Sequence, residues 1–409
     1  MKRKPSARSR RKEDGDHWQS LKLNLPPSSI RDLVVHNDDV VVGTHGRSFW
    51  ILDNITPLRQ ASAQAANAEA YVFKPQLTYR VRRNNNTDTP LPPEEPAGQN
   101  PPDGAMIDYW LKSPLSGAVV LQIYDASNRL VRRFSSADRP ESVNDKELNV
   151  PTYWVRPART LSAAPGMHRF VWDLHYPEPD VLEHEYPISA IYRDTPRYPL
   201  GAAVLPGKYS VTLSVGGKSI VLNNLLEIRM DPRVKTSPED LRRQFELDRK
   251  IADALHRDYQ ALQQVRSLRS QLKALTERRP SPEIAKTIAA LEAKAAALEG
   301  DEGGYGTRFL STPEGRSLAR LNAGCGAVLS ALDSADAAPT TQQLAMVADL
   351  EKALGEQLTN WEQMKSKDVA DLNAQLSKAG LPVIDLEKPR AGSADSGQTT
   401  SQDRDRDVE

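Results

Sequence analysis

The chain has 409 residues with 54 basic and 54 acidic side chains, and this even balance excludes a global electrostatic field for nucleic acids or membranes. Its single cysteine, Cys325, excludes an internal disulfide framework. Thirty prolines and 22 glycines indicate a loop-rich β region beside a more regular one, and the length allows several domains. No apolar run approaches the roughly 20 residues that a membrane-spanning helix needs.

The first segment, residues 1–12, reads MKRKPSARSRRK and contains seven Lys or Arg. No apolar stretch follows, so the segment does not have the pattern of a secretory signal peptide. We expect a disordered basic start, and a nucleic-acid-binding arm is the less favoured alternative. The compartment in which the protein resides is left open.

Residues 13–60 contain three short strand signals around tight turns. Residues 32–35, 40–43 and 49–52 are β-branched or aromatic runs, separated by Asn-Asp-Asp and by Thr-His-Gly-Arg. His45, in the second turn, has no serine or cysteine nucleophile in a recognisable motif nearby, and the Gly-rich turn is better explained by its backbone needs. The pattern predicts a three-stranded meander.

This segment also resembles a known family. Residues 13–18, EDGDHW, resemble the turn of an Asp-box, S-x-D-x-G-x-x-W, with Gly15 and Trp18 in register but Arg11 and Glu13 at the Ser and Asp positions. The run GTHGRSFWILDNITPLRQ closely resembles the closing segment of large bacterial BNR-repeat proteins, a sortilin- and sialidase-like β-propeller class often labelled glycosyl hydrolase. The resemblance extends over roughly residues 13 to 380 and implies a single closing β-propeller blade remnant, as in a C-terminal fragment of such a protein.

A lone blade leaves both faces of its sheet in water, so residues 13–60 are expected to be covered by missing propeller blades or another chain. Members of the family are usually exported. Whether the start is authentic or the chain is a truncation is not decided by the residues.

Residues 61–104 are expected to form a connector and a Pro-rich loop, because Asn, Pro, Glu and Gly dominate its second half. Residues 105–233 then return to alternating strands with Pro and Gly turns, which predicts an antiparallel β-sandwich. Its late strands, after Leu205-Pro206-Gly207, resemble fibronectin type III and Ig-like modules.

Residues 236–380 change to helical composition and period. Ser237-Pro238-Glu239, Ser281-Pro282-Glu283 and Thr312-Pro313-Glu314 repeat one helix-start signal, and Thr340 with Gln343 forms a capping box. These signals predict helices over 238–278, 282–299, 313–333 and 341–379, arranged as a long antiparallel helical bundle with the two short helices end to end. Residues 381–409 are expected to be a disordered tail.

The first long helix has a heptad seam that one carboxylate interrupts. Leu241, Phe245, Ala252, Leu255, Tyr259 and Leu262 follow the seam, and Asp248 stands where a core residue is due. Cys325 lies on a seam of the third helix and is expected to be a buried, unreactive core residue.

The densest polar group is a set of charged residues that we interpret as solvated loop charges between strands: His168, Asp173, His175, Glu178, Asp180, Glu183, His184 and Glu185. Nothing in it matches a zinc-binding spacing, so no metal site, cofactor or catalytic residue is assigned. Trp110 and Trp154 are expected to be more exposed than the other tryptophans.

Together these features predict a multidomain β-plus-α protein without a recognisable reaction. The leading hypothesis is a non-catalytic structural or interaction fragment of an Asp-box propeller protein, with a protein or glycan partner. The alternative is a carbohydrate-binding accessory part of a glycoside-hydrolase-like BNR-repeat protein, with Trp110, Tyr153 and Trp154 as the possible ligand-binding residues.

Overall fold

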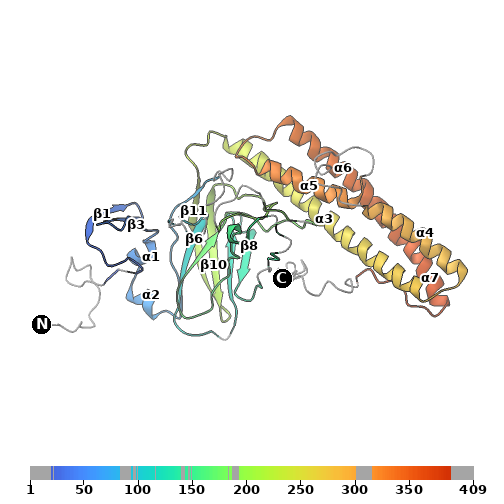
Figure 1. Ribbon diagram of the computed structural model, residues 1–409, viewed down its shortest axis with the longest axis horizontal. Coiled ribbons are helices and arrows are strands. Elements are labelled where there is room, and N and C mark those ends of the chain that lie inside the picture. Colours follow the sequence, from blue (N-terminus) through green and yellow to red (C-terminus); the bar gives the residue numbers. More distant parts are fainter. Residues whose placement is uncertain are drawn as a thin grey trace.

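The computed structural model describes residues 20–82, 100–186, 193–300 and 316–387, with short gaps inside these ranges and two isolated positions outside them. In this part of the chain the protein is mixed β and α, with three sheets and no closed barrel or propeller. The sheets form one end of an elongated molecule, and the long helices extend away from them (Figure 1). The basic start, the Asp-box-like turn and most of the predicted tail lie outside the described residues.

The first sheet is a meander of β1 (Ile30–His36), β2 (Asp39–Thr44) and β3 (Phe49–Leu52), which matches the three predicted strand signals. Asn37 and Gly46 adopt positive φ in its two turns, a conformation that Asn and Gly tolerate best. The short helices α1 (Thr56–Arg59) and α2 (Ala63–Asn67) follow. None of the three hydrophobic clusters of the described chain includes a residue of β1–β3.

Two further sheets share one hydrophobic core. One contains β5 (Thr78–Arg80), β11 (Lys218–Met230), β10 (Gly207–Val215), β7 (Val119–Tyr124) and β8 (Leu130–Ser135), in that order, and the other β4 (Ala70–Val72), β6 (Ala105–Leu111) and β9 (Gly166–Trp172).

The expectation of a purely antiparallel arrangement is wrong at one edge, because β5 pairs with β11 in parallel. Both β4 and β5 come from the segment expected to be only a connector. Their pairing partners are distant in sequence, so local composition did not reveal these short strands.

The helices begin where their caps predicted. Helices α3 (Pro238–Glu277) and α4 (Pro282–Glu299) start after Ser237 and Ser281, and α6 (Thr341–Gln363) starts at the Thr340–Gln343 capping box. Helix α5 (Leu318–Leu332) is capped by Ser317, and the predicted start at Thr312-Pro313 lies outside the described residues. A π-helical turn, η2 (Met364–Val369), separates α6 from α7 (Ala370–Lys378), so the last predicted helix is not uniformly α-helical.

Helix α3 is the central contact of this helical unit. Its second half lies beside α4, where Arg266 and Arg269 pair with Glu299 at 2.8 and 2.7 Å, and its first half lies beside α5. Because α3 also contacts α6, its buried surface is wider than a single seam: Phe245, Ala252 and Tyr259 are half-buried, whereas Ile251, Ala254 and two aspartates are buried. Within the described residues no helix has the length and hydropathy to cross a membrane.

Candidate functional site

The three aromatic residues predicted to bind a ligand lie on different elements. Trp110 is half-buried on β6, whereas Tyr153 and Trp154 lie on a short 3-10 turn, η1 (Thr152–Trp154). Tyr153 is exposed, but the expectation of an exposed Trp154 is wrong, because the residue is 7% exposed and clusters with Val150 and Val155. Of the three rings, Tyr153 is therefore the most accessible to a ligand.

The sequence analysis interpreted the charged set from His168 on β9 to Glu185 as solvated loop charges, and this interpretation is wrong for several of its members. His168 contacts the carbonyl oxygen of Ala164 at 2.6 Å. Burial alone would raise the pKa of Asp173, but His175, Arg132 and Arg159 lie near this carboxylate and lower its pKa. Glu178 pairs with Arg197, and Glu183 lies outside the described residues. Among the described residues, no group of three or more His, Cys, Asp or Glu is placed to hold a metal ion.

The segment after β9 instead docks on the helices. The Tyr176 ring lies 4.5 Å from the Arg249 guanidinium, and Asp180 pairs with Nδ1 of His256 at 2.6 Å. Farther along, the backbone N–H of Leu182 donates to Oδ1 of Asn322 on α5 at 2.9 Å. This docking segment, residues 176–182, therefore joins the sheets to both α3 and α5 by side-chain contacts.

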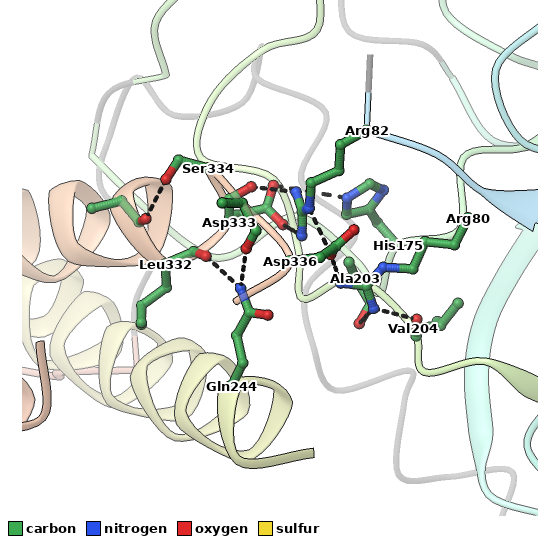
Figure 2. A network of polar contacts seen from close by, with 12 residues as sticks. Arg80, Arg82, His175, Ala203, Val204, Gln244, Leu332, Asp333, Ser334 and Asp336 are labelled. Atoms are coloured by element: carbon green, nitrogen blue, oxygen red, sulfur yellow. Dashed lines mark hydrogen bonds and ion pairs between the residues drawn. The ribbon is translucent and has the colours of Figure 1, made fainter. Parts of the chain in front are cut away.

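A buried network of ion pairs also joins the sheets to the helices, and Figure 2 shows it. We call this contact region the junction. Arg80, the last residue of β5, donates to the carbonyl oxygen of Val204 at 2.7 Å and to Asp336, which follows α5. Arg82 donates from Nε to Asp336 at 2.7 Å and pairs with Asp333 at 2.8 Å. Burial alone would lower the pKa of Arg82, but Asp333 and Asp336 together raise it.

Two more side chains complete this junction network. Nε2 of His175 lies 3.9 Å from Asp333, and Gln244 on α3 donates to the carbonyl oxygens of Leu332 and Ala335 (Figure 2). The Gln244 bonds satisfy carbonyl groups at and just after the C-terminus of α5, where no intrahelical donor is available. The network thus links β5, the β9–β10 segment, α3 and the end of α5.

Helix α3 also carries two buried carboxylates. Asp248 is 2% exposed and Asp258 is fully buried. Burial raises the pKa of each to about 8; nearby Asp333 adds to the effect at Asp248, whereas Asn322 acts against it at Asp258. Burial also raises the pKa of the Cys325 thiol to about 12, which agrees with the predicted unreactive core position.

A third polar centre attaches the first sheet to the others. Asn54, buried and at positive φ, donates from Nδ2 to Asp108 on β6 at 3.0 Å, and Arg169 on β9 donates to the carbonyl oxygens of Asp53 and Asn54 at 3.1 Å. Arg169 also pairs with Asp108 at 2.8 Å, and Asp39 accepts the backbone N–H of Asn54. These contacts give the LDNITPL run a structural role. His45, from the preceding turn between β2 and β3, is exposed.

The sequence did not reveal that Arg80, Arg82, Asp333 and Asp336 form a network, because the partners are about 250 residues apart along the chain. Only the isolated charge of Asp248 in an apolar seam could have pointed to the junction. Comparisons with family models, curated proteins and solved structures found no match.

Proposed function

We propose that the chain is a non-catalytic structural or interaction module, of the Asp-box propeller class that its GTHGRSFWILDNITPLRQ run resembles. In this proposal β1–β3 are a closing blade, the two sheets with a common core are an Ig- or fibronectin-III-like sandwich, and α3–α7 are an antiparallel bundle. The finding that carries the proposal is the composition of the β1–β3 sheet.

Both faces of this sheet carry apolar side chains, although one of them also carries Asp32, His36 and Asp39. Side chains alternate along each strand, so the strand register assigns them to faces. One face carries Leu33, Val35, Val40, Val42, Trp50 and Leu52, and the other carries Val34, Val41, Phe49 and Ile51.

Much of this apolar surface is in contact with water. Phe49 is 80% exposed and Ile51 57% exposed, and all seven residues of β1 are exposed. A small sheet with two uncovered apolar faces is marginally stable alone and favours association with other β-structure. We therefore assign it the role of an association surface that other sheets cover.

Two charged clusters hold segments of the chain together, and this supports a structural role. These contacts join Asp108 to Asn54 and Arg169, and Asp336 to Arg80 and Arg82. Glycoside hydrolysis requires two carboxylates that face a sugar across an open cleft. Turnover on a glycan panel that one carboxylate substitution abolishes would contradict the proposal.

The association surface is tested by charge substitutions on each face of the sheet. The Phe49→Lys/Ile51→Lys and Leu33→Lys/Val35→Lys variants should reduce both apolar-dye binding and self-association in sedimentation velocity experiments. The control is Leu130→Lys/Val221→Lys, which changes residues of similar exposure on β8 and β11. An equal loss in the control, or no loss in the sheet variants, would contradict the assignment.

The alternative function is carbohydrate binding through Trp110, Tyr153 and Trp154. The observation in its favour is the exposed ring of Tyr153, 6.4 Å from that of Trp154 and perpendicular to it. A glycan array distinguishes the two functions, because carbohydrate binding requires a signal that Tyr153→Ala or Trp110→Ala removes. Retention of the signal in both variants would exclude this surface as the binding site.

A further inference from the structure

The junction between sheets and helices contains an uneven set of buried charges. Three carboxylates, Asp248 on α3 and Asp333 and Asp336 after α5, face the two guanidinium groups of Arg80 and Arg82. The side chains of Asp333 and Asp336 are 5% and 2% exposed, so water screens these charges little. The other titratable group of the network is His175, beside Asp333.

The two guanidinium groups are already used by two of the three carboxylates. Arg80 and Arg82 both bond Asp336, and Arg82 also pairs with Asp333. Asp248 receives no such ion pair, and its Oδ1 is buried without a hydrogen-bond partner in the described part of the chain. An ionised Asp248 would therefore be a third negative charge against two positive charges, which is costly in a buried site.

A neutral Asp248 removes this imbalance and also has a nearby acceptor. Oε1 of Gln244 is buried and without a described partner, and Gln244 lies four residues before Asp248, on the same side of α3. Two buried acceptors cannot bond each other unless one carries a proton, as a protonated carboxyl does. Nε2 of Gln244 donates to the carbonyl oxygens at the end of α5, so its Oε1 is left as an acceptor. A protonated Asp248 supplies a donor for this acceptor while the helices stay docked on the sheets.

The electrostatics of the site agree with this geometry. Burial and the charge of Asp333 raise the pKa of Asp248 to about 8, and the opposing effects of Arg82 and Arg80 are too small to reverse the shift. Once the junction opens, water reaches the carboxyl and its pKa returns toward the ordinary value of about 4.

We propose that docking of the helices on the sheets is coupled to one proton on Asp248, so that the junction is closed when this carboxyl is neutral and opens as the carboxyl releases its proton to solvent. The device is independent of what the β1–β3 sheet binds. As a result, the helices separate from the sheets more readily as the pH rises from mildly acidic to mildly alkaline values.

The expected pH dependence follows from proton linkage. Between about pH 5 and pH 7.5 the open state has lost a proton that the closed state keeps, so the opening equilibrium should rise about tenfold per pH unit. Above about pH 8 both states are ionised at this site, and the increase should level off.

Hydrogen–deuterium exchange of the full chain measures this opening directly. The readout is peptides that cover residues 80–82, 173–182 and 330–337, with rates corrected for the intrinsic pH dependence of exchange. The wild type should show the tenfold rise per pH unit in these peptides, and Asp248→Asn should abolish it. A flat wild-type profile, or an unchanged rise in Asp248→Asn, would overturn the proposal.

Three variants separate Asp248 from the other titratable groups. His175→Gln and His256→Gln remove the imidazoles that face the junction network and the docking segment, and each should keep the rise. Asp258→Asn removes the other buried carboxylate of α3 and should also keep it. Loss of the rise in a histidine variant, with retention in Asp248→Asn, would assign the proton elsewhere and overturn the proposal.

A second substitution covers the case in which Asp248→Asn fails to fold. Asp248→Leu is neutral and removes both polar oxygens, so its junction peptides should exchange at the same corrected rate at pH 5 and pH 7.5. If neither variant folds, a flat wild-type profile still overturns the proposal, and so does loss of the rise in His175→Gln, His256→Gln or Asp258→Asn.

Discussion

At the scale of single residues, the unusual feature is the pair of buried carboxylates on α3. Asp248 and Asp258 both have pKa values raised to about 8, above the ordinary value near 4. A group whose pKa is raised by folding binds its proton more tightly in the folded state. The stability that it contributes is full below about pH 4 and is lost as the pH rises toward 8. Asp173, whose pKa is lowered, contributes stability with the opposite sign, which is lost in acid.

The Asp258→Asn variant tests this sign. Asn keeps the shape of the neutral acid but has no charge to bury, so the free energy of unfolding at pH 8 should rise by about 2 kcal/mol, with little change at pH 4. Urea unfolding followed by circular dichroism at pH 4, 6 and 8 measures both values. Asp253→Asn is the matched control, because Asp253 is an exposed residue of the same helix. A loss of stability at pH 8 in Asp258→Asn would show that the carboxylate is ionised and paired.

At the scale of elements, Asn54 forms the buried attachment of the β1–β3 sheet. Its residues belong to none of the described hydrophobic clusters, and Asn54 connects it to β6 and β9 through Asp108 and Arg169. The side-chain oxygen of Asn54 also accepts the backbone N–H of Thr56, so one residue shapes the turn and bonds a buried carboxylate.

Replacing Asn54 by Ala should therefore loosen this sheet selectively. The variant loses the bond to Asp108 and places an alanine at a φ of 56°, for a combined local cost of about 2–3 kcal/mol. Hydrogen exchange should increase in residues 30–52 and remain unchanged in α3–α7. Asn128→Ala is the control, since Asn128 also has positive φ, at 59°, but lies in the exposed β7–β8 turn. Equal effects of the two substitutions would mean that backbone strain alone explains the result.

At the scale of the whole molecule, the path of the segment between β9 and β10 decides how the helices sit on the sheets. A buried glycine, Gly201, lies against its start: a Cβ there would be 2.2 Å from the carbonyl oxygen of Tyr176 and 2.3 Å from that of Pro177. Contacts this close to backbone atoms cannot be relieved by a side-chain rotation.

Gly201→Ala should accordingly displace Tyr176 and Asp180 from α3. We expect a lower midpoint of thermal unfolding and a larger radius of gyration in small-angle X-ray scattering, with a destabilisation of about 2–4 kcal/mol. Gly207→Ala is the control, because nothing lies within 4 Å of the Cβ position there. Unchanged scattering and stability in Gly201→Ala would mean that this segment does not set the arrangement.

The elements that local chemistry encodes could be predicted from the sequence. Ser237, Ser281 and Thr340 each cap the helix that follows, because a hydroxyl at this position satisfies backbone N–H groups within the same short segment. The β-branched run Val40, Val41 and Val42, with turns on either side, likewise predicts a strand from neighbouring residues alone. The short strands β4 and β5 escaped prediction because their partners are distant in sequence.

The sequence by itself thus determined the order and type of most elements, the core position of Cys325 and the three short strands of the first sheet. Only the tertiary structure decided that Asp248 and Asp258 are buried, that Arg80 and Arg82 pair with carboxylates after α5, and that Asn54 joins two sheets. The physical reason is the range of the interactions. Caps and strand patterns depend on neighbours along the chain, whereas burial and ion pairing depend on which distant surfaces meet.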